Sequence, residues 1–318
     1  MTVLVTGASG FVGGAVVRRL VADGCTTWAG VRTPADLPSD VRQILVGSLG
    51  PDTDWRPAVV GADAVVHAAA RVHVMRETSG DPLAEFRRAN VAGTMALARQ
   101  AAESGVRRFV FISSIKVNGE GTDAGHPYTS NTPPAPVDPY GISKHEAEQQ
   151  LLALSTETGM AVSVIRPVLV YGPGVKGNFR SLMRAIERGL PLPLGAIDNR
   201  RSLVALDNLV DLIARCLVHP GAPGRTFLVS DDHDLSTPQL IQRMAAAMGR
   251  SARLVPVPPS LMLAAARVVG GRAALQRLCG SLQVDISDTR RRLDWTPPVS
   301  VDGALARAVR AVAPPRRS

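Results

Sequence analysis

The chain has 318 residues, of which 45% are hydrophobic and 20% are charged, a balance that predicts a globular protein with a sizeable core. A net charge of +9 raises the question of a nucleic-acid partner, but the basic residues are scattered and only 4% of the residues are aromatic. Few rings are therefore available to stack on bases, and we expect no nucleic-acid partner. An anionic small substrate explains the charge equally well.

Three widely spaced cysteines, Cys25, Cys216 and Cys279, form neither a disulfide framework nor a metal-binding pattern. No apolar run reaches the roughly 18 residues that a membrane-spanning helix requires. The chain opens directly into a strand-like segment with no signal-peptide pattern before it. We expect a cytoplasmic protein with no integral membrane segment and no metal site.

Short β-rich runs alternate with longer helical patterns through the first half of the chain. Strands are predicted at 2–6, 26–31, 42–46, 63–67, 107–113 and 161–166, and helices at 11–23, 81–104 and 139–158. This alternation predicts an α/β fold with a parallel sheet covered on both faces. The alternation then loosens, and further helices are predicted at 178–189, 207–218, 237–249 and 260–269. We expect a first domain over 1–170 and a smaller, interleaved lobe over 171–313.

The first predicted strand runs directly into TGASGFVGGAVVRRL, in which Gly7, Gly10 and Gly13 are spaced GxxGxxG. Glycines let the backbone turn tightly and approach a pyrophosphate at the N-terminus of the following helix. A glycine-rich turn alone is a weak signal, but its position between a strand and a helix strengthens it. The segment therefore predicts a dinucleotide site.

Residues 138–149 read DPYGISKHEAEQ, with Asp138 as a helix N-cap and Pro139 at the first helical position. Tyr140 and Lys144 are four residues apart and share one face of this helix. Taken alone, they read most simply as a solvated surface pair. Beside a nicotinamide they have a chemical use, because an adjacent ammonium lowers the pKa of a phenol from its usual value of about 10.

These motifs, with others in the same order, resemble the extended short-chain dehydrogenases/reductases, the nucleotide-sugar epimerase/dehydratase family. The other matching segments are HAAA at 67–70, NVAGT at 90–94, FISSIKVNG at 111–119 and RPVLVYGPG at 166–174. The resemblance covers nearly the whole chain and implies a Rossmann doubly wound parallel sheet with a smaller C-terminal substrate-binding lobe. It also implies a catalytic trio in which Tyr140 transfers the proton, Ser114 binds the same oxygen, and Lys144 holds the nicotinamide ribose.

The cofactor contacts that the resemblance implies come from the phosphate loop, the strand ends and the active-site segment. They are Gly7, Ser9, Gly10, Phe11, Val12, Gly13, Arg32, Ser48, Leu49, Ala68, Ala69, Ala70, Asn90, Ser113, Tyr140, Lys144, Pro167 and Val170. Arg32 follows the second predicted strand, with no acid before Asp36, and an arginine there can pair with a 2′-phosphate. The sequence therefore favours NADP(H) over NAD(H), against the simpler interpretation of a solvated arginine.

The resemblance further implies a nucleoside diphosphate bound in the second lobe. The expected substrate contacts are Arg71, His73, Ser114, Lys116, Asn178, Leu192, Leu194 and Arg201, with Arg200 as a rival to Arg201. His67 and His73 have no partnering cysteine or acid cluster, so we interpret them as structural or pocket-lining residues and not as metal ligands.

The segments HAAARVHVM, SSIKVNGEGT and NRRSLVALDNLVDL are most similar to bacterial nucleotide-sugar 4-ketoreductases of surface-polysaccharide synthesis. That similarity implies NADPH-dependent reduction of a UDP-2-acetamido-2,6-dideoxy-hexos-4-ulose. A UDP-hexose 4-epimerase with retained NAD and a non-catalytic NADP(H)-binding sensor are the alternatives. Ile115 and Lys116 replace the Asp-Glu of the family's dehydratases, which disfavours dehydration, and Asn118 replaces its usual tyrosine. The resemblance also implies a homodimer formed through helices 81–104 and 139–158.

Overall fold

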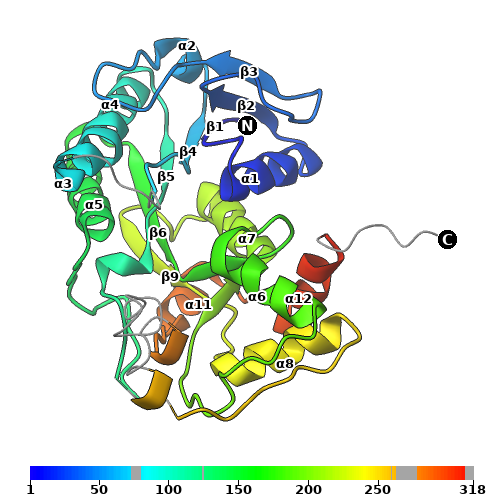
Figure 1. The fold of residues 1–318 in the computed structure, drawn as a ribbon. Coiled ribbons are helices and arrows are strands. Elements are labelled where there is room, and N and C mark those ends of the chain that lie inside the picture. Colours follow the sequence, from blue (N-terminus) through cyan, green and yellow to red (C-terminus); the bar gives the residue numbers. More distant parts are fainter. Residues whose placement is uncertain (73–79, 124, 259, 263–277, 312–318) are drawn as a thin grey trace.

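The computed structural model describes residues 1–72, 80–123, 125–258, 260–262 and 278–311. Its centre is a seven-stranded sheet of order β3-β2-β1-β4-β5-β6-β9, in which every neighbouring pair is parallel (Figure 1). The strands are β1 (Thr2–Thr6), β2 (Thr26–Val31), β3 (Arg42–Leu45), β4 (Ala64–His67), β5 (Arg108–Ile112), β6 (Ala161–Pro167) and β9 (Arg225–Val229). The doubly wound Rossmann sheet predicted from the sequence is confirmed, and β9 is an additional edge strand that the sequence did not reveal.

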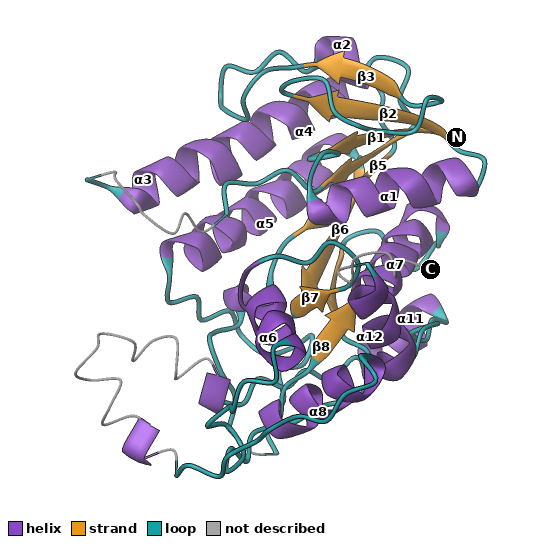
Figure 2. Cartoon of the chain, turned by 45° about the vertical axis from the view of Figure 1, so that its right-hand side comes forward, coloured by secondary structure: helices purple, strands orange, loops and turns teal. Residues whose placement is uncertain are grey.

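Helices cover both faces of the sheet (Figures 1 and 2). One face carries α1 (Phe11–Ala22), α7 (Leu206–Val218) and α11 (Ser287–Leu293), and the other carries α2 (Arg56–Val59), α4 (Thr94–Glu103) and α5 (Pro139–Thr158). Side chains of a strand alternate between the faces, so Val3 and Val5 enter the first core and Leu4 enters the second. Because both faces are buried, each of these strands is a nearly continuous apolar run.

The helix predicted at 81–104 forms as three consecutive pieces. These are α3 (Pro82–Phe86), the π-helical segment η1 (Arg87–Gly93) and α4. A Cβ on Gly93 would lie 2.9 Å from both the backbone nitrogen of Gly50 and the side chain of Leu49. The glycine therefore lets this helix pack closely against the loop that follows β3.

The second lobe has its own apolar core, formed around the two-stranded parallel pair β7 (Leu169–Tyr171) and β8 (Leu203–Ala205). Around it pack α6 (Gly177–Glu187), α8 (Thr237–Ala247) and α12 (Val301–Arg310) (Figure 2). Between these elements the chain returns to the first lobe, where α7 packs against α1 and β9 pairs with β6. The two lobes are thus interleaved along the chain.

Several elements of the second half were not predicted from the sequence. The sequence did not reveal β7, β8, α11 or α12, and most of the helix predicted at 260–269 lies outside the described residues. Within the described ranges, no helix has the length and apolar character needed to cross a bilayer. The three cysteines are all free.

Candidate active site

The loop after β1 is shaped by two glycines that leave no room for a side chain. Gly7 has a φ of +68°, and a Cβ there would lie 2.7 Å from the backbone nitrogen of Ala69. A Cβ on Gly13 would lie 2.2 Å from the carbonyl oxygen of Gly7. Gly10 caps α1 without any side-chain hydrogen bond, so no capping side chain satisfies the first-turn N–H groups. This arrangement fits the pyrophosphate of a dinucleotide at a helix N-terminus.

His67, the last residue of β4, is fully buried between two threonines. Its Nδ1 lies 2.6 Å from Thr6 Oγ1, and its Nε2 lies 2.9 Å from Thr94 Oγ1. Burial, with a smaller effect of the charge of Lys144, lowers the pKa of His67 to about 3. The imidazole is therefore neutral and joins β1, β4 and α4, which agrees with the structural interpretation made from the sequence.

Asn90, in the π-helical segment η1, connects the segment after β4 to α5. Its Oδ1 accepts a 2.7 Å hydrogen bond from the backbone N–H of Arg71, and its Nδ2 donates to the Arg71 carbonyl at 3.0 Å. The same Nδ2 donates to Ser143 Oγ at 3.0 Å, and that hydroxyl donates to the carbonyl of Tyr140 at 2.8 Å. Asn90 thus holds the turn that carries Tyr140, through a π-helical distortion of a kind often found at functional sites.

The helix α5 begins as the sequence predicted. Asp138 is its N-cap, with Oδ1 accepting a 2.6 Å hydrogen bond from the Gly141 N–H, and Pro139 is its first residue. Tyr140 is half-buried, and its ring meets Phe86 edge-on at a centroid distance of 6.1 Å. Burial, with a smaller effect of the charge of Asp138, raises the pKa of Tyr140 to about 12.

Lys144 is 1% exposed, and its Nζ lies 4.0 Å from the centroid of the Phe111 ring. Burial lowers the pKa of Lys144 to about 7, while the charge of Glu148 acts in the opposite direction. The sequence predicted that this ammonium would lower the pKa of Tyr140. In the structure the pKa of the phenol is raised instead, with burial as the larger cause and the charge of Asp138 as the second.

A buried polar network that the sequence analysis missed lies beside Lys144. Arg166 Nε donates to Glu148 Oε1 at 2.9 Å, and Arg166 Nη1 donates to Asn118 Oδ1 at 3.0 Å. The hydroxyl of Ser113 also donates to Glu148, and its cofactor contact stays a prediction. The spacing of Glu148, one helical turn after Lys144, is the signal that could have revealed it.

Ser114 follows β5 and caps the short 3₁₀ helix η2 (Ile115–Val117). Its Oγ accepts a 3.2 Å hydrogen bond from the N–H of Lys116. The ammonium of Lys116, expected to contact substrate, forms ion pairs with Asp138 and, at 2.8 Å, with Glu120. Its substrate contact stays a prediction, and its observed partners are these carboxylates.

The remaining residues predicted to bind cofactor gather at the carboxyl ends of the parallel strands, where ligands bind in such sheets. Arg32 is exposed just past β2, and within the described ranges its guanidinium has no hydrogen-bond or ion-pair partner. Ser48 is exposed, and its carbonyl accepts a 2.6 Å hydrogen bond from Thr53. Pro167 ends β6, and Val170 is half-buried in β7.

The predicted substrate residues of the second lobe have different environments. Asn178 is exposed in the first turn of α6, whereas Leu194 is buried in the lobe's core with Leu192 packed against it. Arg201 is half-buried, donates from Nη1 to the Gly280 carbonyl at 2.8 Å, and has its pKa lowered by burial. His73 lies outside the described residues. Their roles in substrate binding stay predictions.

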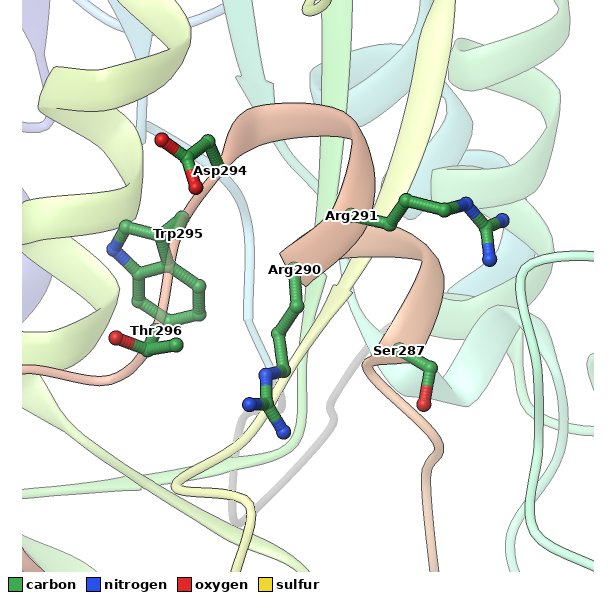
Figure 3. A pocket seen from close by; sticks show the side chains of 6 residues that line it. All are labelled: Ser287, Arg290, Arg291, Asp294, Trp295 and Thr296. Atoms are coloured by element: carbon green, nitrogen blue, oxygen red, sulfur yellow. The ribbon is translucent and has the colours of Figure 1, made fainter.

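A hollow of about 390 Å³ lies elsewhere, beside α11, and Figure 3 shows the side chains that line it. Both arginines that line it form ion pairs with carboxylates: Arg290 pairs with Asp232 and Arg291 pairs with Asp288, each at 2.6 Å. None of its lining residues belongs to the predicted cofactor or catalytic sets. In the described part of the chain, no group of three His, Cys, Asp or Glu side chains could hold a metal ion.

Comparison with known proteins agrees with this geometry. Residues 3–230 match the model of the NAD dependent epimerase/dehydratase family. The chain is 44% identical to a UDP-glucose 4-epimerase of Vibrio cholerae over 98% of its own length and 95% of the relative's.

The fold is also shared with solved structures of low sequence identity. A Thermotoga maritima UDP-glucose 4-epimerase solved with UDP-glucose has a TM-score of 0.78 at 22% identity, covering 98% of each chain. A Bacillus cereus UDP-glucuronic acid 4-epimerase in complex with NAD also scores 0.78, at 20% identity, covering 98% of this chain and 96% of that one. The Rossmann sheet, the glycine loop and the matched sequence together identify this chain as a member of the NAD-dependent epimerase/dehydratase family.

Proposed function

We propose that this protein is a UDP-hexose 4-epimerase that works with a retained NAD. The observation that carries the proposal is the 44% identity to the Vibrio cholerae UDP-glucose 4-epimerase over 98% of this chain. The sequence motifs alone favoured a 4-ketoreductase, and the similarity supports the epimerase alternative better. The intact Ser114, Tyr140 and Lys144 argue against a non-catalytic sensor.

In this proposal, residues of the chain transfer the proton and orient the sugar. Tyr140 removes the proton from the sugar 4-hydroxyl and returns it later, while the Ser114 hydroxyl donates to the same oxygen. Lys144 holds the nicotinamide ribose, and its positive charge favours the phenolate of Tyr140. The nicotinamide, when bound, supplies the hydride transfer. Inversion requires the 4-keto sugar to present its other face before C4 regains the hydride and Tyr140 returns the proton.

One observation favours a second candidate, an NADPH-dependent 4-ketoreductase. Arg32 stands exposed just past β2, with no partner among the described residues, at the position where the second strand meets the adenosine ribose. A free guanidinium there suits a 2′-phosphate. A reductase must exchange its cofactor after each turnover, whereas an epimerase keeps it, and this difference separates the two candidates.

The deciding experiment identifies the nucleotide that co-purifies with the protein and then compares two assays. UDP-glucose or UDP-N-acetylglucosamine supplied alone should be interconverted with its 4-epimer, without added cofactor and with NAD in the purified protein. The 4-keto sugar supplied with NADPH should leave the nicotinamide absorbance unchanged. NADPH consumption with the keto sugar, and no interconversion of UDP-hexoses, would replace the epimerase proposal with the reductase.

We further propose that the protein acts in the cytoplasm as a homodimer. The three free cysteines fit a reducing compartment. The dimer follows from the family resemblance, in which helices equivalent to 81–104 (α3, η1 and α4) and 139–158 (α5) pack against those of the partner. Light scattering at micromolar concentration tests the oligomeric state, and a monomer would contradict it.

A further inference from the structure

The ammonium of Lys144 is buried without a counter-ion in contact. Its side chain is 1% exposed, and among the described residues it forms neither a hydrogen bond nor an ion pair. A buried charge is costly unless other groups stabilise it. The group that its Nζ meets is the ring of Phe111, whose centroid lies 4.0 Å away. Phe111 belongs to β5 and is itself fully buried, so water does not weaken the contact.

The carboxylate one turn further along α5 is engaged by other donors. Glu148 accepts from Arg166 Nε at 2.9 Å and also from Arg166 Nη2, and the hydroxyl of Ser113 donates to it as well. Its charge therefore acts on Lys144 from a distance, while Arg166 is its contact partner. The structure thus keeps the acid of this region away from the ammonium and gives the ammonium a ring instead.

A second ring that packs on Phe111 carries no charge. His67 stacks on Phe111 with ring centroids 5.8 Å apart and an angle of 21° between the planes. Its two ring nitrogens lie within hydrogen-bond distance of Thr6 and Thr94, and burial keeps the imidazole neutral. A protonated imidazole would repel the ammonium and compete for the negative face of the same ring. The neutral form leaves that face to Lys144.

We propose that Phe111 is a positioning residue that holds the ammonium of Lys144 by a cation–π contact and leaves its N–H groups available to the ribose hydroxyls of the cofactor. An ammonium has three N–H donors, and an ion pair with a carboxylate would occupy one or more of them. A ring face attracts the charge without such an acceptor. The inference rests on the role of Lys144 in the proposed function.

The test measures the pKa of Lys144 directly, by carbon-13 NMR of protein loaded with NAD and labelled at the lysine Cε. The chain has three lysines, Lys116, Lys144 and Lys176, so three resonances are expected, and Lys144→Met assigns the one of interest. The charged and titratable groups that surround this lysine are Tyr140 and Glu148 on its own helix, His67 on β4 and Arg166 on β6. All four are unchanged in the variants below.

The variants replace Phe111 site-specifically by phenylalanines that carry one, two or three fluorine atoms. Fluorine weakens the negative potential of the ring face stepwise and nearly preserves the shape of the ring, so packing and folding are retained. The pKa of Lys144 should fall with each added fluorine, by roughly one unit for the trifluorinated ring. A contact that is only structural would leave the pKa where it is.

Phe109 provides the matched control. It is fully buried on the same strand and also packs on His67, at a centroid distance of 5.9 Å, but Lys144 lies over the ring of Phe111. The same fluorinated residues at position 109 should leave the pKa of Lys144 unchanged. An unmoved pKa in the Phe111 series, or an equal fall in the Phe109 series, overturns the inference.

The pH profile of kcat for the interconversion of UDP-hexoses is the second measurement. If turnover needs the protonated form of Lys144, the alkaline limb of the profile should move to lower pH in the Phe111 series, by the shift that NMR gives. A shifted pKa with an unmoved profile would overturn the role of Lys144 in the proposed function and leave its contact with Phe111 standing.

Discussion

Arg166 and Glu148 form a buried ion pair beside the candidate active site, with side chains 8% and 3% exposed. Breaking such a pair by removing one partner costs about 3–5 kcal/mol, because the other charge stays buried and unpaired. We expect Glu148→Gln to lower the free energy of unfolding by roughly that amount, measured by urea denaturation.

The exposed pair between Arg87 and Glu146 provides the matched control on the same helix. Arg87→Met should lower the free energy of unfolding by no more than about 1 kcal/mol, because exposed ion pairs contribute little to stability. Equal losses for Glu148→Gln and Arg87→Met would show that burial of the Arg166 pair carries no special penalty.

Replacing Tyr140 by phenylalanine removes the hydroxyl and keeps the ring that meets Phe86. Turnover should fall by roughly 10²–10⁴-fold, the usual contribution of a general acid/base group, while the unfolding midpoint and cofactor content stay unchanged. Steady-state kinetics and thermal unfolding measure these effects. Tyr128→Phe is the control for loss of a tyrosine hydroxyl, and near-normal activity of the Tyr140 variant would remove Tyr140 from the proposed mechanism.

The exposed guanidinium of Arg32 allows a test of whether the cofactor is NADP or NAD. If it meets a 2′-phosphate, Arg32→Ala should weaken NADP binding by roughly 10-fold or more, as expected for loss of a charge-assisted contact, and leave NAD binding nearly unchanged. Calorimetric titration of both nucleotides into protein stripped of cofactor measures the difference. Equal effects on both nucleotides, or tighter binding of NAD to the native protein, would speak for the retained NAD of the proposed epimerase.

The buried imidazole of His67 links stability to pH. Its pKa in the folded protein is about 3, against 6.5 for the unperturbed group, so the unfolded chain binds a proton between these values that the folded chain does not. The free energy of unfolding should therefore fall as the pH is lowered from about 6.5 to about 3, by at most about 1.4 kcal/mol per pH unit from this residue.

Urea denaturation across this pH range measures how the free energy of unfolding changes with pH. His67→Gln lacks the titrating group, so its unfolding free energy should change less steeply with pH than that of the native protein. Identical slopes for the His67 variant and the native protein would contradict a neutral buried imidazole.

The local sequence alone was sufficient to predict the elements that carry the motifs. The glycine loop between β1 and α1 was predicted from steric requirements that act within a few residues, and the start of α5 at Asp138 and Pro139 was predicted from local capping chemistry. The six strands predicted in the first half are present because apolar β-rich runs between helices have few alternatives to a covered parallel sheet.

The sequence did not determine the partners that meet across the fold. β9 joins the sheet beside β6 because residues more than 60 positions apart are brought together, for example Ser163 and Arg225. Glu148 also meets Arg166 from a different element, 18 positions away, and Lys116 meets Asp138 across 22 positions. The direction of the pKa shift at Tyr140 was also decided by the tertiary structure, because burial, its larger cause, depends on the surrounding elements.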